Sequence, residues 1–437
     1  MRDVEGVIAR MGGQGHGVLD KDGERFYVPF TVPGDRVSAK VGEERGDGFA
    51  AQLSVLEDAG PDRVEPPCRH FQACGGCALQ HWADAPYRDW KRDRLVSALQ
   101  RRDFTDPPAA DLVDDLVEVP DRSRRRAEFV ARRVKNRVLM GFHEAASRKI
   151  VDLEDCVVLR PALFAVLPAL RAMIIEVLGD GWAVDLRVTE TLTGLDVVII
   201  GKLKMRVQER IALSRAAKAA ALARLSWRFD MSSEPEMLYQ GEAAPLVKFG
   251  DTVVTLAPGG FLQATAEAEQ AMADLALDAL KDAKRVADLF SGCGAFALRL
   301  AAAGKSVLAA DADRPAIAAL TAAAKAAGLG GRLTAEMRDL ERRPLTRQEF
   351  KKLDAILLDP PRAGARAQVQ QIAEATQAGA GGGDTAPPLV VMAACDPNSF
   401  ARDARVLVDA GYRLERATPI DQFRWSPHLE MLGIFRR

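Results

Sequence analysis

The chain has 437 residues, which is more than one hydrophobic core usually holds, so we expect two or three domains. Its content of 48% hydrophobic and 28% charged residues is typical of a soluble globular protein. No apolar run reaches the roughly 18 residues that a membrane helix needs, and the N-terminus lacks the features of a signal peptide. We therefore expect a cytoplasmic protein without a membrane partner. The net charge of −1 does not by itself indicate a nucleic-acid partner.

Residues 1–60 are predicted to form a small β-barrel. Short β-rich pieces at 6–9, 25–30 and 36–41 alternate with turns. Small barrels of this kind often bind oligonucleotides. Residues 61–260 follow as a predicted central α/β domain, with an irregular segment at its start and strands at 197–200 and 253–256.

The central domain contains a basic stretch between residues 122 and 137. One acid, Glu128, stands there among eight basic residues: Arg122, Arg124, Arg125, Arg126, Arg132, Arg133, Lys135 and Arg137. Such a stretch can bind phosphate locally, although it can also be an ordinary solvated face.

Residues 261–437 have a different pattern, in which alanine-rich helical stretches alternate with short apolar strands. The strands are expected at 285–290, 306–311, 355–359 and 389–393. This alternation predicts a doubly wound, mainly parallel sheet of the Rossmann-like type. Ligands of such sheets bind at the carboxyl ends of the strands.

A glycine-containing loop, Ser291-Gly292-Cys293-Gly294, follows the first of these strands and indicates a cofactor site. Asp311, at the end of the second strand, suits a ribose diol, and Asp339 could meet an adenine amino group. NAD is the alternative ligand. However, Ala297 stands where its third glycine is expected, and Asp288 before the loop would repel a pyrophosphate. Asp288 suits the ammonium of an amino-acid moiety, which favours S-adenosylmethionine (SAM).

Two further motifs follow strand ends, Asp359-Pro360-Pro361-Arg362 and Cys395-Asp396-Pro397. Methylation of uracil at C5 needs groups of this kind, because a thiolate must add to C6 before C5 becomes nucleophilic, and a base must then remove the C5 proton. Cys395 fits the nucleophile and Glu430 the base, while Asp359 could position the uracil. Taken singly, a cysteine is more often a buried small side chain, and a glutamate is more often a surface acid.

Together these motifs make the chain resemble the bacterial RNA uracil-C5 methyltransferase family, and in particular its iron–sulfur members that act on 23S rRNA. The family's F-x-Q element is matched by Phe261-Leu262-Gln263, and its C-terminal H-x-E by His428-Leu429-Glu430. Its cofactor loop is matched by residues 288–294, its D-P-P-R by residues 359–362, and its cysteine motif by residues 395–397 and 401–403. The resemblance covers nearly the whole chain.

The resemblance implies a TRAM-type RNA-binding barrel in residues 1–60 and a SAM-dependent catalytic domain in residues 261–437. It also implies Cys395 as nucleophile, Glu430 as base, and a set of SAM contacts: Gln263, Phe290, Asp311, Asp339 and Asp359. The chain departs from the family at Ala394, Asp396 and Arg424. Asp396 could raise the pKa of Cys395 by like-charge repulsion.

Four remaining cysteines, Cys68, Cys74, Cys77 and Cys156, form a set of soft ligands that fits zinc or an iron–sulfur cluster. The resemblance favours a 4Fe-4S cluster in the central domain. It also favours 23S rRNA as the partner, with a tRNA uracil-C5 methyltransferase or a non-catalytic RNA-binding protein as alternatives. We expect a monomer.

Overall fold

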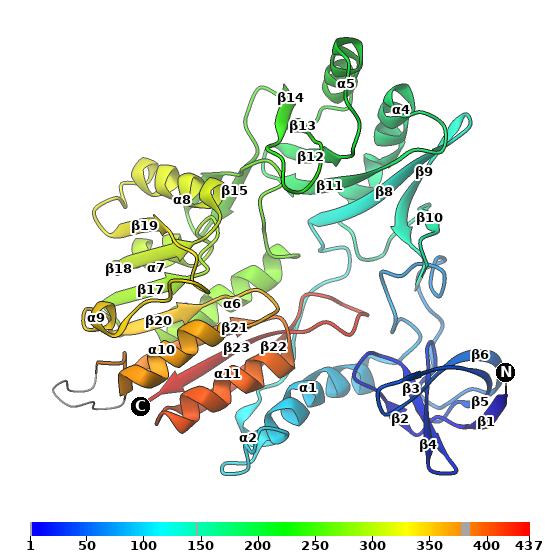
Figure 1. Ribbon diagram of the computed structural model, residues 1–437, viewed down its shortest axis with the longest axis horizontal. Helices are drawn as coiled ribbons and strands as arrows, with labels where there is room; N and C mark the ends of the chain where they lie inside the picture. The colour runs from blue at the N-terminus through cyan, green and yellow to red at the C-terminus, as the bar shows by residue number, and fades with distance from the viewer. Residues whose placement is uncertain (1, 146, 377–384) are drawn as a thin grey trace.

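The computed structural model describes residues 2–145, 147–376 and 385–437. Within these residues the strands form sheets of six, seven and eight strands and a hairpin of β15 (Leu246–Phe249) and β16 (Thr252–Thr255). The six-stranded sheet lies at the lower right of Figure 1, the seven-stranded sheet at the top, and the eight-stranded sheet at the lower left. No helix in the described residues is long and apolar enough to cross a membrane.

The N-terminal sheet has the strand order β1-β5-β6-β4-β3-β2. Alternation along β5 places Val37, Ala39 and Val41 in its core. Asp35 is fully buried and accepts the Gly60 N–H at 2.8 Å, while Arg63 donates to it at 2.5 Å, which ties the sheet to the chain that follows. The strand bounds are β1 (Asp3–Val7), β2 (Arg10–Met11), β3 (Gly17–Lys21), β4 (Glu24–Val28), β5 (Arg36–Arg45) and β6 (Gly48–Asp58).

The central sheet has the order β10-β9-β8-β11-β12-β13-β14. The apolar face of α4, which includes Leu170 and Ile174, packs in its core. The strands are β8 (Arg126–Val134), β9 (Arg137–His143), β10 (Ile150–Asp152), β11 (Ala183–Thr191), β12 (Gly194–Ile200), β13 (Arg224–Arg228) and β14 (Glu236–Gln240). The helices are α3 (Pro161–Ala165), α4 (Leu167–Val177) and α5 (Val207–Ala219).

The C-terminal sheet has the order β19-β18-β17-β20-β21-β23-β22-β7, and its first five strands are parallel. These five include the four strands predicted from the sequence. β20 and β21 are buried along their whole length, as expected where helices cover both faces. The bounds are β17 (Arg285–Leu289), β18 (Ser306–Asp311), β19 (Leu333–Met337), β20 (Ala355–Leu358), β21 (Leu389–Ala394), β22 (Arg413–Asp421) and β23 (Glu430–Arg436).

Two hydrophobic cores lie on the two faces of this sheet. One includes side chains of α6 (Ala266–Ala279), α7 (Ala297–Ala302) and α8 (Arg314–Ala326). The other includes side chains of α1 (Asp84–Gln100), α2 (Ala109–Leu112), α9 (Arg347–Phe350), α10 (Arg366–Thr376) and α11 (Pro397–Asp409).

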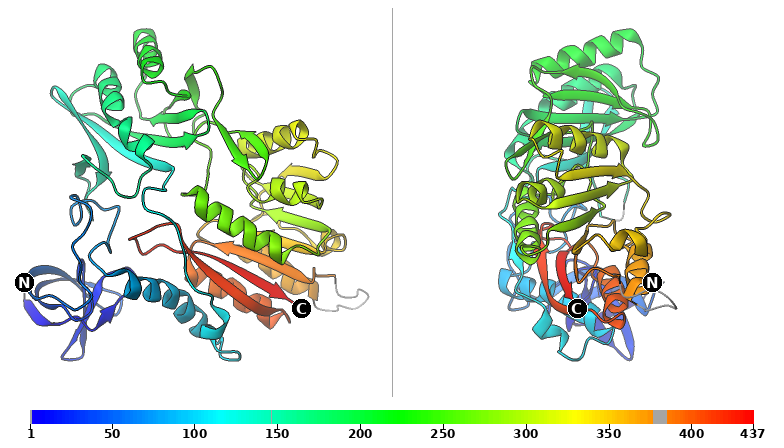
Figure 2. Two further views of the ribbon diagram at one scale, coloured as in Figure 1. Left: turned by 180° about the vertical axis from the view of Figure 1, so that it is seen from behind. Right: turned by 90° about the vertical axis from the view of Figure 1, so that its left-hand side faces the viewer.

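Residues 84–118 pack on the C-terminal sheet although they precede the central sheet in the chain. β7 (Val117–Glu118) pairs with β22 as the last strand of the sheet. Figure 2 shows α1 running from the N-terminal sheet along the C-terminal sheet. The sequence predicted domain boundaries at residues 60 and 260. The structure shows that residues 84–118, which lie between these boundaries, pack with the C-terminal part.

Arg125 joins the central and C-terminal parts of the molecule from a buried position. Its backbone N–H donates to the Ala264 carbonyl at 2.9 Å, and its Nε donates to the Gln263 carbonyl at 3.1 Å. Its guanidinium pairs with Glu269 of α6 at 2.6 Å, and Arg299 of α7 contacts the same carboxylate at 3.5 Å. One side chain therefore holds the segment before α6 against the start of β8.

We predict that Arg125→Met lowers the free energy of unfolding by about 3 kcal/mol, because Glu269 stays buried with only the longer Arg299 contact. Thermal and urea unfolding would measure the loss. Arg132→Met is the matched control, since Arg132 lies exposed on β8, the strand that begins directly after Arg125. Equal stability of the two variants would contradict this role for Arg125.

Candidate active site

A cavity of about 1000 Å³ opens at the carboxyl ends of the parallel strands. It lies where the strand order reverses between β17 and β20, which is the usual ligand position in doubly wound sheets. Its wall contains seven of the residues that the sequence singled out for catalysis or cofactor binding: Gln263, Phe290, Asp311, Asp339, Asp359, Cys395 and Glu430.

The loop after β17 forms one side of this cavity and has an unusual backbone. Phe290, Gly292 and Gly294 have positive φ angles of 63°, 52° and 99°. A Cβ on Gly294 would lie 2.5 Å from Leu320, so only glycine fits there. The Gly292 N–H donates to Asp311 at 2.8 Å, which fixes the loop against the end of β18. The loop thereby opens a concave surface toward the cavity.

Asp288 does not occupy the position that the sequence suggested. It is fully buried beneath the loop and does not line the cavity, so it is not placed to meet a ligand's ammonium group. Among the described residues its carboxylate oxygens have no hydrogen-bond partner, although the Ala297 N–H opposes the rise in its pKa. Burial and the nearby Asp359 raise the pKa of Asp288 well above its ordinary value. Asp288 is therefore part of the buried support under the loop.

Strand register places Cys395 opposite Glu430. β21 and β23 are antiparallel, and Ala394 pairs with Met431, so the next residue on each side faces the other across the strands. The same logic places Phe290 beside Asp359, because Leu289 pairs with Leu358. Strand pairing thus brings together side chains from separate parts of the sequence: Cys395, Glu430, Phe290 and Asp359.

The acids at the cavity floor have raised pKa values. Burial raises the pKa of Glu430 to about 8, and the Asp359 carboxylate adds to this effect. Burial also raises the pKa of Asp359 to about 7, while the Gln263 amide, 3.3 Å away, lowers it. Two buried carboxyl groups that titrate near neutral pH suit proton transfer.

Burial, followed by the charges of Glu430 and Asp359, raises the pKa of Cys395 to about 12. The exposed Arg362 is the positive charge that opposes this rise. Asp396 acts in the direction expected from the sequence but is the smallest of these causes. Its carboxylate caps α11 instead, accepting the N–H groups of Asn398 and Ser399 at 3.0 and 2.9 Å.

Sequence reasoning missed the glutamine that follows β22. Gln422 donates to Glu430 at 2.8 Å and to Gln263 at 2.9 Å. No local motif marks this residue, since its role depends on the packing of three separate segments. Only its place beside Asp421, in the segment that leads to the H-x-E motif, could have drawn attention to it.

The chain between β22 and β23 is anchored to α1. Lys91 donates to Asp421 at 2.7 Å, and Tyr87 donates to the other oxygen of Asp421 at 2.6 Å. Lys91 also donates to the His428 carbonyl. All three side chains are buried, so helix α1 fixes the segment that carries Gln422 and Glu430.

The basic stretch is not one uniform phosphate-binding face. Arg125 is buried in the contacts described above, and Arg133 donates to the Ile175 and Leu178 carbonyls near the end of α4. Arg124 and Arg126 face the active-site cavity, with Arg126 stacked 4.7 Å from the centre of the exposed Phe261 ring. Basic groups therefore line the cavity wall, although fewer than the sequence suggested.

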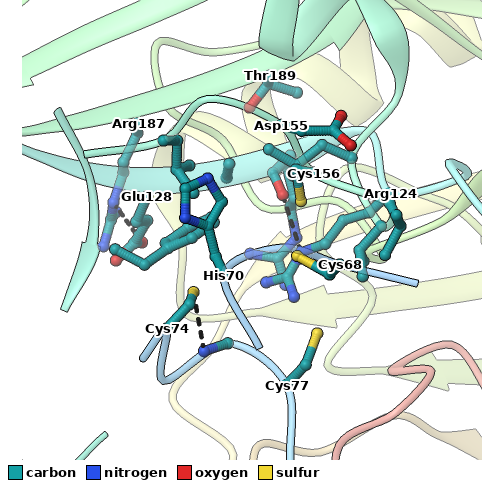
Figure 3. A pocket seen from close by; sticks show the side chains of 18 of the residues that line it. Cys68, His70, Cys74, Cys77, Arg124, Glu128, Asp155, Cys156, Arg187 and Thr189 are labelled. Atoms are coloured by element: carbon teal, nitrogen blue, oxygen red, sulfur yellow. Dashed lines mark hydrogen bonds and ion pairs between the residues drawn. The ribbon is translucent and has the colours of Figure 1, made fainter. Parts of the chain in front are cut away.

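Cys68, Cys74, Cys77 and Cys156 line a second cavity of about 390 Å³ (Figure 3). Arg124, Arg126, Phe261 and Gly76 belong to the walls of both cavities. The Gly76 N–H donates to the Cys74 sulfur at 3.4 Å. Within the described part of the chain, no three or more Cys, His, Asp or Glu are arranged to hold a metal ion. The four thiols thus surround a space and do not meet at one point.

Comparison with known proteins identifies the family. Residues 250–437 match the family model of tRNA (uracil-5-)-methyltransferases. An uncharacterised RNA methyltransferase of Mesorhizobium japonicum is 40% identical, over 98% of this chain and 97% of the relative. The 23S rRNA (uracil(1939)-C(5))-methyltransferase RlmD of Halomonas elongata is 34% identical, over 98% of this chain and 88% of the relative.

A solved structure shares the fold. The tRNA (uracil-54, C5)-methyltransferase of Pyrococcus abyssi, crystallised with S-adenosyl-L-homocysteine, aligns with a TM-score of 0.74 at 21% identity. The alignment covers 99% of this chain and 100% of that one. With relatives of this identity over nearly the full length, the chain belongs to the family of RNA (uracil-C5)-methyltransferases.

Proposed function

We propose that the protein methylates C5 of a uridine in 23S rRNA, with Cys395 as nucleophile, Glu430 as base and SAM as methyl donor. The observation that carries this proposal is the pairing of β21 with β23, which sets a thiol and a carboxyl group opposite each other at one cavity. A methyl transfer to a nitrogen or an oxygen would not need the thiol.

The residues divide the reaction into two steps. The Cys395 thiolate forms a bond with C6 of uracil, and the electron pair of the C5–C6 double bond makes C5 nucleophilic. After C5 has taken the methyl group, the Glu430 carboxylate accepts the C5 proton, the double bond re-forms and the bond between C6 and Cys395 breaks. Arg362 favours the thiolate that starts the sequence, because its charge lowers the pKa of Cys395.

The other cavity residues fit an adenosine-containing donor. When bound, SAM supplies the electrophilic methyl group. Asp311, which already accepts the Gly292 N–H with one oxygen, stands at the strand end where a ribose diol is usually held. We assign Gln263, Phe290, Asp339 and Asp359 to the same ligand because they line the same cavity.

Ribosomal RNA is favoured over tRNA as the substrate. The named relative that acts on 23S rRNA is 34% identical over 98% of this chain, whereas the tRNA enzyme of known structure is 21% identical and supports the fold alone. Residues 1–60, as an RNA-binding barrel, and the arginines that line the cavity would hold the RNA backbone. The uridine must be unpaired or flipped to reach the cavity.

We further propose that the four cysteines hold a 4Fe-4S cluster. In such a cluster each thiolate binds a different iron, so the sulfurs surround a cavity, whereas zinc needs all four about 2.3 Å from one point. The residues fit the larger group, because all four thiols line one space and Gly76 donates its N–H to one of the sulfurs. The group would link residues 68–77 to the central sheet.

The reaction is tested by Cys395→Ala. This change is expected to abolish methylation and the covalent complex with RNA containing 5-fluorouridine, while SAM binding persists, because the cofactor wall is intact. Denaturing gels and calorimetry would measure the two properties. Cys293→Ala, which alters the other cysteine at the cavity, should still form the complex. Normal turnover by Cys395→Ala would rule out the mechanism.

The metal site is tested by Cys77→Ala. This variant should lose the iron, the acid-labile sulfide and the visible absorbance of the anaerobically purified protein, whereas Cys293→Ala retains them. One zinc per chain without iron in the native protein, which would be colourless, would contradict the cluster.

A further inference from the structure

Gln422 lies behind the floor of the active-site cavity. It is 2% exposed and does not line the cavity, so it does not touch the substrate or the cofactor. It follows β22 directly, and Lys91 and Tyr87 hold the preceding Asp421. Its backbone position is therefore fixed by the buried contacts with α1.

The side-chain amide of Gln422 joins three segments. Its oxygen accepts the Ala264 N–H at 3.0 Å. Its Nε2 donates both to Glu430, at 2.8 Å, and to the side-chain oxygen of Gln263, at 2.9 Å. The Nε2 of Gln263 then donates to Asp359 at 3.3 Å. A continuous hydrogen-bond chain thus connects the carboxyl groups of Glu430 and Asp359.

The direction of this chain is set by the backbone. The Ala264 N–H can only donate, so the oxygen of Gln422 must face it and the NH₂ group must face Glu430. The oxygen of Gln263 accepts from that NH₂ group, which turns the NH₂ group of Gln263 toward Asp359. Both carboxyl groups therefore receive a donor, and each donor favours the ionised carboxylate.

We propose that Gln422 is a positioning residue for the second half of the reaction: it orients the Glu430 carboxylate for removal of the C5 proton. This inference rests on the proposed function. It separates Gln422 from Gln263, because only Gln263 reaches the cavity wall.

The step affected is release of the covalent complex. Cys395 forms its bond to C6 without Gln422, which contacts neither group. Proton removal needs ionised Glu430, and the groups that act on its pKa lie on several elements. Asp359 after β20 raises this pKa, while Gln422 after β22 and Arg126 of β8 lower it. Loss of the Gln422 donor therefore moves the working range of the base to higher pH.

The test uses Gln422→Met, which keeps the side-chain length but removes every hydrogen bond, and Gln422→Glu, which replaces the NH₂ donor by a carboxyl oxygen and, when ionised, sets a second negative charge beside Glu430. With unmodified 23S rRNA and SAM, both variants should accumulate a methylated covalent complex that resolves roughly tenfold or more slowly than in the wild type, as expected for a lost bond to a charged group. Raising the pH should speed its resolution. Denaturing gels and mass measurement of the complex would follow the time course.

Gln368→Met is the matched control. Gln368 is as buried as Gln422 and its amide bonds only to the Leu345 backbone, away from the cavity. It should lose stability without accumulating the complex. Resolution at the wild-type rate in both Gln422 variants, with weaker SAM binding or lower stability as the sole change, would overturn the inference. Failure of the wild-type protein to form any complex with 5-fluorouridine RNA would instead overturn the proposed function.

Discussion

The antiparallel pairing of β23 with β21 is the constraint on which the active site depends. The first five strands of the sheet are parallel, so their carboxyl ends supply the loop after β17, Asp359 and Cys395 at one edge. β23 runs the other way and brings its first residue, Glu430, to the same edge. A one-residue shift of β23 would move Glu430 to the other face of the sheet, since successive side chains alternate. The side chains of β23 are buried on both faces of the sheet, with Met431 and Phe435 in one core and Leu432 and Ile434 in the other.

The raised pKa values of the buried acids follow from their burial and from the crowding of carboxyl groups at this edge of the sheet. Asp288, Asp359 and Glu430 all have pKa values raised by burial, and the adjacent acids add to the effect in each. Buried carboxyl groups remain compatible with folding when they are neutral or hydrogen-bonded. Burial raises the pKa of Asp288 well above its ordinary value, whereas Glu430 and Asp359 receive amide donors from Gln422 and Gln263. The amide donors thus lower the pKa values of Glu430 and Asp359 against the rise that burial causes.

The sequence predicted that the cofactor loop, Asp359 and Cys395 would meet at one cavity because these motifs follow strand ends. The loop at 288–294, Asp359 and Cys395 are each local patterns, and the parallel sheet makes their meeting predictable. Nonlocal packing explains what was missed. Gln422 acts through Ala264 and Glu430, and α1 with β7 joins a sheet that is built mostly from residues after 284. In the sequence, Arg125 and Arg133 look like part of a phosphate-binding patch. In the fold, Arg125 pairs with Glu269, and Arg133 donates to carbonyls near the end of α4.

The proposed function is defined by the nucleotide that the protein methylates. Mass mapping of 5-methyluridine in the rRNA and tRNA of a strain that lacks this protein tests it most directly. We expect one 5-methyluridine to disappear from 23S rRNA and to return with the wild-type protein. An unchanged 23S rRNA, or loss confined to tRNA, would contradict the account.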